Sequence, residues 1–193
     1  YTAKVLAVVC LLEAGALGAW YCRTHKVPRQ VQLALSAAVF GNEEAGYKLA
    51  YNYFRGYGGD EKFHEDLDKA AYWYEWSIRH GSLDAVVDYA NLLEDGNAFP
   101  QDIPKAIEYL RIGEAAGDPT ALNNMAIHHL LGDYVEQNVP LAIDYFTRAA
   151  QAGNPMAMTN LGVAYRDGVG CEKDPKKAFS CFQMAAQQDE PLG

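Results

Sequence analysis

A 36-residue period between Ser82 and Asp189 constrains the fold of this chain more than any other feature of its sequence. Glycine recurs at this interval at Gly81, Gly117 and Gly153. Two alanine columns follow the same interval: Ala85, Ala121 and Ala157, and Ala70, Ala106, Ala142 and Ala178. Self-similarity at a period of roughly 20 to 50 residues indicates a solenoid, whose units bury their apolar faces by stacking on neighbouring units.

An earlier copy of the unit extends from Asn42 to Gly81 and contains about four additional residues. Its matching positions, offset by 40 residues from the next copy, are Ala45, Leu49, Ala50, Tyr53 and Gly56. The additional residues fall between Tyr57 and Glu65, in a turn-rich segment with two adjacent glycines. This insertion is either a contact loop or tolerated surface length.

Each copy contains two runs in which apolar residues recur at intervals of three and four, which places each run on one face of a helix. In one copy the runs are Ala85, Tyr89, Ala90, Leu93 and then Ala106, Tyr109, Leu110, Gly113. The recurring alanines and glycines predict close contacts, where a larger side chain would force the helices apart. Each unit is therefore expected to be a helix-turn-helix hairpin.

Capping residues and glycines predict where these helices begin and end. The first helix of a unit should begin at Asp118-Pro119 or Asn154-Pro155, because Asp and Asn are good caps and proline suits the first helical position. It should end near the glycine column Gly96, Gly132 and Gly168. The second helix should begin after Asp102, Asn138 and Asp174, and end at Gly117 and Gly153.

The last copy shows the whole pattern: Ala157, Leu161-Gly162, Tyr165, Gly168-Val169-Gly170, Asp174, Lys177-Ala178, Phe182 and Ala185-Ala186. This pattern, present in four copies from about Asn42 to Asp189, resembles the Sel1-like repeat family, a relative of the tetratricopeptide repeats. The chain departs from it at Asp189, which replaces the last glycine, and at His129 in the tyrosine column. The resemblance implies a right-handed superhelix that scaffolds other proteins and carries no chemistry of its own.

Composition and motifs exclude several function classes. The formal net charge is −9 and the isoelectric point is near 4.9, so no nucleic-acid partner is expected, because phosphate binding needs clustered cations. The sequence contains no nucleophile elbow, P-loop, zinc-protease or dinucleotide motif. We therefore expect no catalytic residue, no metal and no cofactor. The cysteines, Cys10, Cys22, Cys171 and Cys181, form no CxxC pair, which favours reduced thiols and a reducing compartment.

Residues 1–27 are expected to hold a single transmembrane helix. The 18 residues from Val5 to Cys22 are all apolar or small except Glu13, and this length is near the lower limit for crossing a hydrocarbon core of roughly 30 Å. Trp20 and Tyr21 suit the headgroup region, and the cations after Cys22 suit the cytoplasmic side. The alternatives are a helix that caps the solenoid and a signal peptide.

The expected packing face of this helix consists of small residues around one carboxyl group: Glu13, Ala14, Gly15, Gly18 and Ala19. Pairs of small residues four positions apart let another helix approach closely in lipid. A carboxyl group inside a membrane usually faces protein rather than lipid. Glu13 could instead lie close enough to one end of the helix to reach water. The face favours a helix that packs against a membrane complex over a lone tether.

The expected fold is an all-α solenoid of helix-turn-helix repeats that follows the membrane helix. Residues 28–41 resemble the second helix of a repeat and should cap the solenoid as a half-repeat. Residues 42–193 should form four repeats (42–81, 82–117, 118–153 and 154–189) and a tail. The protein should be a single-pass membrane protein with these repeats on the cytoplasmic side.

A groove lined by the first helices is the expected site for protein partners. Its expected residues are Tyr47, Tyr51, Phe54, Arg55, Asn91, Asn123, Ile127, Leu130, Leu131 and Arg166. Aromatic, aliphatic and arginine side chains anchor peptides and partner helices well, although each could instead pack on a neighbouring unit. The sequence thus favours a non-catalytic scaffold, an accessory subunit or assembly factor of a membrane complex. The alternatives are a soluble or periplasmic peptide-binding module and an enzyme of unknown type.

Overall fold

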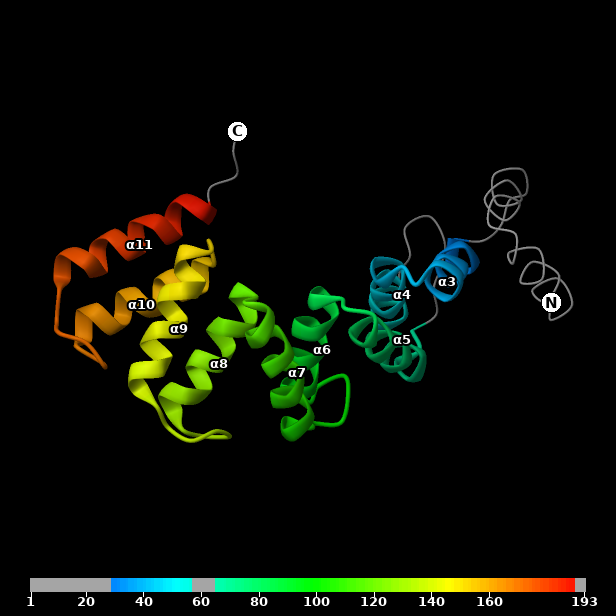
Figure 1. The fold of residues 1–193 in the computed structure, drawn as a ribbon, viewed down its shortest axis with the longest axis horizontal. Helices are drawn as coiled ribbons and strands as arrows, with labels where there is room; N and C mark the ends of the chain where they lie inside the picture. The colour runs from blue at the N-terminus through cyan, green and yellow to red at the C-terminus, as the bar shows by residue number, and fades with distance from the viewer. Residues whose placement is uncertain (1–28, 57–64, 190–193) are drawn as a thin grey trace, which may run out of the picture. The chain divides into compact units, whose positions relative to one another are not determined.

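A computed structural model of the protein describes residues 29–56 and 65–189, and all regular structure in this part of the chain is α-helical (Figure 1). The helices are α3 (Arg29–Phe40), α4 (Glu43–Arg55), α5 (Leu67–Arg79), α6 (Leu83–Asp95), α7 (Ile103–Ala116), α8 (Pro119–Leu131), α9 (Val139–Gln151), α10 (Pro155–Asp167) and α11 (Pro175–Asp189). The expectation of an all-α solenoid built from helical hairpins is confirmed.

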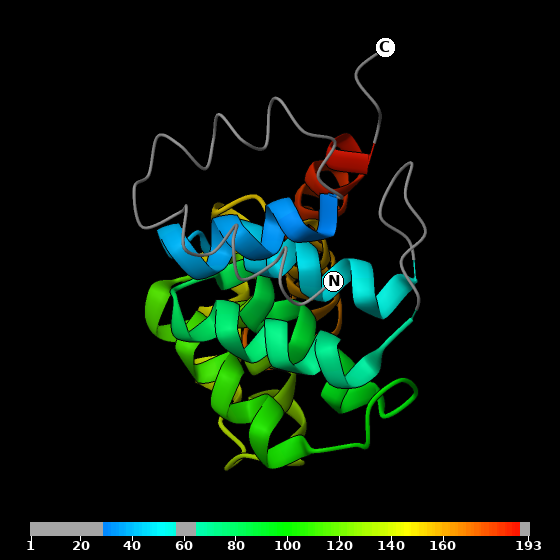
Figure 2. The same cartoon turned by 90° about the vertical axis from the view of Figure 1, so that its right-hand side faces the viewer.

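The helices form two compact units, one extending to Ala85 and the other beginning at Val86. In the first unit α4 pairs with α5, and α3 lies alongside α4, as Figure 2 shows. In the second unit α8 pairs with α9 and α10 with α11, while α9 packs on α10 and α7 on α8. Each hairpin in the second unit therefore rests on the next one, which is how a solenoid buries apolar faces that a single hairpin would leave exposed.

The predicted helix ends are present. Asp118 begins α8, and its carboxylate accepts hydrogen bonds from the backbone N–H groups of Thr120 and Ala121. Asn154 caps α10 in the same way, through a bond from the Ala157 N–H to its side-chain oxygen. At the other end of α8, Gly132 has a φ angle of 71°, a left-handed conformation that favours glycine.

Small residues allow the close helix contacts that the repeat columns predict. A Cβ atom at Gly113 of α7 would lie 2.5 Å from the Cβ atom of Ala121 in α8. A Cβ atom at Gly162 of α10 would lie 2.7 Å from Cε1 of Phe182 in α11. Ala121 itself is fully buried, as are most of the other repeated alanines. These contacts keep the apolar surfaces of successive helices together without a gap.

The predicted membrane helix lies outside the described residues, and with it Glu13, Ala14, Gly15, Gly18, Ala19 and two of the cysteines. Among the helices described, none is both long enough and apolar enough to span a bilayer. Most of the insertion after Gly56 also lies outside the described residues, which resume at Glu65.

Candidate functional site

In the second unit, one surface combines side chains from three successive first helices: α6 from Val86 onward, α8 and α10. We call it the first-helix face and define it by Asn91, Glu94, Asp95, Asn124, Ile127, Leu130, Leu131, Asn160, Val163, Arg166 and Asp167. Residues 36 positions apart are equivalent on it, so Asn91, Ile127 and Val163 form one column. Leu131 lies in the column between Asp95 and Asp167.

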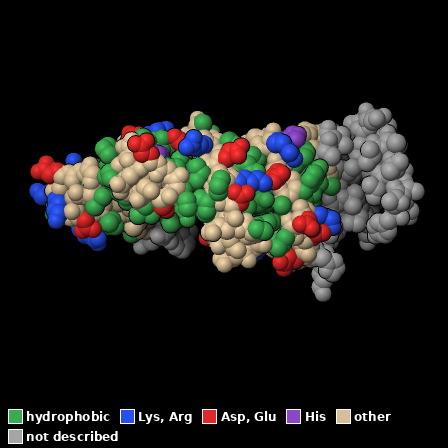
Figure 3. All heavy atoms as spheres, turned by 90° about the horizontal axis from the view of Figure 1, so that it is seen from below, with side chains coloured by type: hydrophobic (Ala, Val, Ile, Leu, Met, Phe, Trp, Pro, Cys, Tyr) green, Lys and Arg blue, Asp and Glu red, His purple; other side chains and the backbone are tan. Residues whose placement is uncertain are grey.

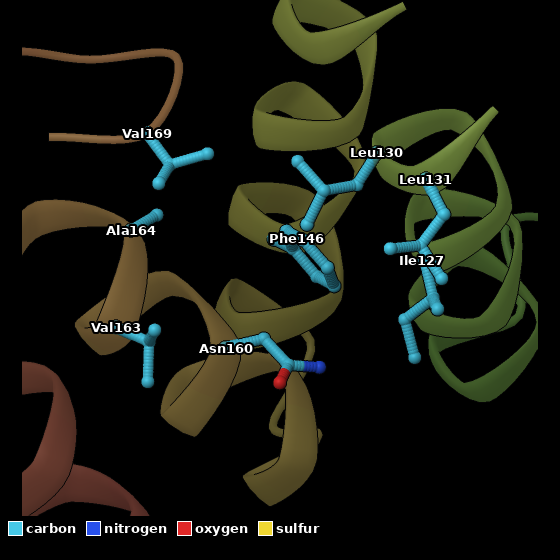
Figure 4. Close-up of a pocket in the computed structure, with 8 residues that line it drawn as sticks. All are labelled: Ile127, Leu130, Leu131, Phe146, Asn160, Val163, Ala164 and Val169. Atoms are coloured by element: carbon cyan, nitrogen blue, oxygen red, sulfur yellow. The ribbon is translucent and has the colours of Figure 1, made fainter. Parts of the chain in front are cut away.

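An apolar hollow of about 270 Å³ opens in this face between α8 and α10 (Figure 4). Ile127, Leu130 and Leu131 line it from α8. The opposite side is formed by Val163, Ala164 and Asn160 of α10 and by Val169 in the following loop, with Phe146 of α9 between the two sides. Asn160 is the one polar side chain among the eight residues that line the hollow. Its volume suits a large apolar side chain rather than a whole cofactor.

Four asparagines form a chain of side-chain hydrogen bonds that runs from this hollow across the face. Asn160 Nδ2 donates to Asn123 Oδ1 at 2.9 Å, and Asn123 Nδ2 donates to Asn124 Oδ1 at 3.2 Å. Asn124 Nδ2 then donates to Asn91 Oδ1 at 2.8 Å. This asparagine relay joins α10, α8 and α6, and it satisfies the side chain of Asn123, which is only 1% exposed.

The relay leaves an unused hydrogen-bonding group at each end. Within the described residues nothing accepts from Asn91 Nδ2, and nothing donates to Asn160 Oδ1. Both side chains are half-buried, so these groups remain open to solvent. The face therefore presents a free amide donor on α6 and a free amide acceptor beside the apolar hollow.

A buried histidine ties α8 to α6 and to the loop after α8. His128 Nε2 lies 3.2 Å from Glu94 Oε1, and its Nδ1 lies 3.1 Å from Asp133 Oδ1. The hydrogen bond to Glu94 raises the pKa of His128 above its ordinary value, with a further contribution from Asp133, although burial of the ring opposes the shift. In its charged form His128 donates to both carboxylates.

The predicted groove residues differ in whether the structure places them on the first-helix face. It brings Ile127, Leu130 and Leu131 together in one hollow, and Leu131 is 62% exposed. Asn123 does not line the surface as expected, because its side chain turns inward and becomes an internal link of the relay. Arg166 is exposed and forms an ion pair with Asp167, Nη2 to Oδ2 at 2.7 Å.

Four other predicted groove residues, Tyr47, Tyr51, Phe54 and Arg55, belong to α4 in the first unit. Tyr51 and Arg55 are exposed, whereas Tyr47 and Phe54 are half-buried. The ring of Tyr47 lies 6.3 Å from that of Tyr74 in α5, so it packs within its own hairpin. This first-unit set is therefore only partly available for a partner.

Sequence reasoning did not identify Phe146, Val169 or the contacts of His128. Phe146 belongs to a second helix, and only first helices were expected to line the groove, but its ring reaches the hollow between α8 and α10. His128 precedes His129, which stands in the tyrosine column, and no motif distinguishes it. The 34-residue separation of His128 from Glu94 is close to the repeat period and is the signal that could have suggested their contact.

No arrangement typical of a metal or redox centre is found in the described parts of the chain. They contain no group of three or more His, Cys, Asp or Glu side chains that could hold a metal ion. Cys171 and Cys181 are both free thiols, and burial raises the pKa of Cys181, which makes it a poorer nucleophile. Charged side chains of both signs are interspersed with apolar ones on the face shown in Figure 3.

Stacked helical hairpins of 36 residues, with an apolar hollow and open amides on the first helices, define an α-solenoid repeat protein. The sequence model of the Sel1 repeat matches residues 44–82, 83–118, 119–154 and 155–190. The chain belongs to the Sel1 repeat family. Sel1 repeats generally mediate protein–protein interactions and are typically non-catalytic scaffolds.

Solved structures with the same fold support this assignment. One is a protective antigen present in uropathogenic Escherichia coli strains, with 25% identity over 83% of this chain and a TM-score of 0.74. Another is a Sel1 repeat protein from Oxalobacter formigenes, with 27% identity over 85% of this chain and a TM-score of 0.70. The present chain spans 33% and 47% of their respective lengths.

A third structure, the cysteine-rich protein B of Helicobacter pylori, is 20% identical over 65% of this chain, with a TM-score of 0.51, and shows likeness of fold alone. The match covers 90% of that protein. None of the curated proteins compared with the chain matches it.

Proposed function

We propose that this protein is a non-catalytic scaffold that serves as an accessory subunit or assembly factor of a membrane protein complex. The observation that carries the interaction role is the apolar hollow on the first-helix face, where Leu131 is exposed beside Ile127 and Leu130. Soluble proteins cover most large apolar side chains, so an exposed apolar hollow framed by polar residues is typical of a binding site.

The membrane part of the proposal rests on the sequence of residues 1–27. The small residues around Glu13 suit a helix that packs against another membrane helix. Such a helix, with the repeats on the cytoplasmic side, would give the chain two docking sites for one complex. Two linked contacts raise the effective concentration of the second contact once the first has formed.

Native purification in a mild detergent, followed by mass spectrometry of the copurified proteins, tests this function. We expect a stoichiometric set of membrane proteins. We also expect Gly15→Leu and Gly18→Leu to release the protein from that set while leaving it in the membrane fraction, because a larger side chain prevents close helix approach. Wild-type levels of copurification for both variants would contradict the docking role of this helix.

A photo-cross-linking amino acid tests the interaction role of the face separately. When this amino acid replaces Leu131 in the protein expressed in its native cells, it should form a cross-link to a protein partner. The matched control replaces Ile112, which is exposed on α7, and should form no cross-link to that partner. If the protein purifies from the soluble fraction without membrane proteins and still forms a cross-link at position 131, it is a soluble or periplasmic peptide-binding module. If position 131 forms no cross-link to any protein, the scaffold function itself is contradicted.

A further inference from the structure

The open groups of the first-helix face define what kind of segment it can hold. Asn91 Nδ2 is an unused donor and Asn160 Oδ1 an unused acceptor, and they lie at opposite ends of the asparagine relay. Peptide backbones carry one N–H donor and one C=O acceptor per residue. In a helix these groups are already bonded to one another, whereas in an extended segment they are available. The relay therefore suits an extended backbone.

The apolar hollow supplies a specific position for one side chain of that segment. Its lining consists of aliphatic and aromatic groups of Ile127, Leu130, Leu131 and their neighbours around Phe146, and its volume is about 270 Å³. Asn160 lies in the same lining, so its carbonyl oxygen stands next to the hollow. A backbone N–H bonded to Asn160 would thus belong to a residue at or beside the one whose side chain fills the hollow.

The charge of the face indicates what surrounds this anchor. The first-helix face carries three carboxylates, Glu94, Asp95 and Asp167, and one cation, Arg166, giving a net charge of −2 with histidine neutral. The second helices α7, α9 and α11 carry four carboxylates and five cations, giving a net charge of +1. Arg166 is already paired with Asp167, and Glu94 contacts His128, so among the described residues Asp95 is the carboxylate of the face without an ion-pair partner. The first-helix face is thus acidic, whereas the second helices of this unit are not, and Asp95 is its open carboxylate.

We propose that the first-helix face binds an extended, basic segment of a partner protein, with a leucine- or phenylalanine-like side chain in the hollow and Lys or Arg beside it. This inference rests on the proposed interaction function and adds the chemistry of the partner. The carboxylates attract the cations of the segment, the relay ends bind its backbone, and the hollow takes its apolar anchor.

Fluorescence anisotropy with the full chain and four labelled pools of short synthetic peptides tests the inference. The first pool has Leu or Phe at the centre with Lys and Arg on both sides, the second has the same centre with Glu on both sides, and the third has Ser at the centre with Lys and Arg. The fourth repeats the first pool with N-methylated backbone amides around the centre. We expect the first pool to bind at least about tenfold more tightly than each of the others.

Single substitutions locate the binding on this face. Leu131→Ser should weaken binding of the first pool by about tenfold, since it removes an apolar wall of the hollow. Asn160→Ala should also weaken binding, because it removes the acceptor for the backbone of the peptide. Asp95→Lys should weaken it as well, because it repels the cations of the peptide. Ile112→Ser is the matched control, because Ile112 is also an exposed apolar residue but lies on α7, and it should leave binding unchanged. Circular dichroism melting of each variant checks that the fold is retained.

Three results would overturn the inference: equal binding of the glutamate-flanked pool, binding that Leu131→Ser does not change, or no binding of any pool. None of these results decides the broader function, because the cross-link at position 131 reports a partner of any chemistry. A mapped cross-link to an acidic or helical segment would refute the inference and leave the scaffold function intact. A mapped cross-link to a basic, extended segment with an apolar centre would support both.

Discussion

His128 Nε2 lies 3.2 Å from Glu94 Oε1, so a buried imidazole on α8 binds a carboxylate on α6. Its other ring nitrogen lies 3.1 Å from Asp133 Oδ1 in the loop that follows α8. A neutral imidazole has only one N–H group and can donate to only one of these oxygens, whereas the charged ring donates to both. The contact between two successive repeats therefore depends on the charge of one side chain.

We predict that this contact makes stability depend on pH. The pKa of His128 is raised in the folded protein by the hydrogen bond to Glu94, so the folded state binds the proton more tightly than the unfolded chain does. The stabilisation is fully present below about pH 6.5, the ordinary pKa of histidine, and is lost as the pH rises through the raised value. Urea unfolding at mildly acidic and mildly alkaline pH measures it.

His128→Gln provides the comparison for that experiment, because glutamine keeps hydrogen-bonding groups but does not titrate. We expect the variant to be less stable than the wild type by about 1 to 3 kcal/mol in mildly acidic solution, with a smaller difference in alkaline solution. Groups that do not contact His128 are the same in both proteins, so the change of this difference with pH reports the contact of His128 with Glu94 and Asp133. A difference that does not change with pH would contradict the role of the charged ring.

Gly113→Ala should destabilise the protein although alanine favours helices. Alanine in place of a helical glycine usually gains about 1 kcal/mol. Here the new Cβ atom would lie 2.5 Å from the Cβ atom of Ala121, which is bonded directly to the backbone of α8 and moves only with that helix. We expect a net loss of about 1 to 3 kcal/mol in thermal or urea unfolding.

Gly162→Ala tests the reason for that loss. Its Cβ atom would meet the ring of Phe182 at 2.7 Å, but this ring can turn at the end of its side chain, so the cost should be smaller than at Gly113. If Gly113→Ala instead stabilises the protein, the helices α7 and α8 do not approach as closely as described.

Gly132→Ala should cost more than Gly117→Ala. Both glycines end a helix with a left-handed backbone, with φ angles of 71° and 75°, where any residue with a Cβ atom loses about 1 to 2 kcal/mol. At Gly117 no described residue beyond the chain neighbours lies within 4 Å of the new Cβ atom, whereas at Gly132 the new atom would lie 2.7 Å from Cβ of Gln137. Chemical denaturation of the two variants measures the difference, and equal costs would show that the loop after Gly132 adjusts freely.

The asparagine relay should appear as coupling between residues in different repeats. In a double-mutant cycle, Asn124→Ala and Asn91→Ala should show an interaction free energy of about 0.5 to 1.5 kcal/mol, because the two amides share a hydrogen bond of 2.8 Å. Asn91→Ala paired with Thr159→Ala is the control cycle, since within the described parts of the chain the Thr159 hydroxyl bonds only to the carbonyl of Pro155. If the effects of the two single substitutions on the unfolding free energy simply add in the first cycle, this hydrogen bond does not contribute to stability.

Much of the fold and part of the site follow from local features of the sequence. The 36-residue period, the caps at Asp118 and Asn154 and the small residues at Gly113 and Gly162 act within a helix or between adjacent helices, so their effect can be derived without coordinates. The same columns place Ile127, Leu130 and Leu131 on one helix face, and the structure gathers them around one hollow.

The inward turn of Asn123, the ring of Phe146 in the hollow and the contact of His128 with Glu94 were decided by the tertiary structure. A repeat period shows which residues are equivalent, but it does not predict which residue of one repeat contacts which residue of the next. That pairing depends on how far successive hairpins are shifted and rotated as they pack. The sequence by itself determined the helices, their ends and their contact faces, and only the packing of one repeat on another joined Asn160 to Asn123 and His128 to Glu94.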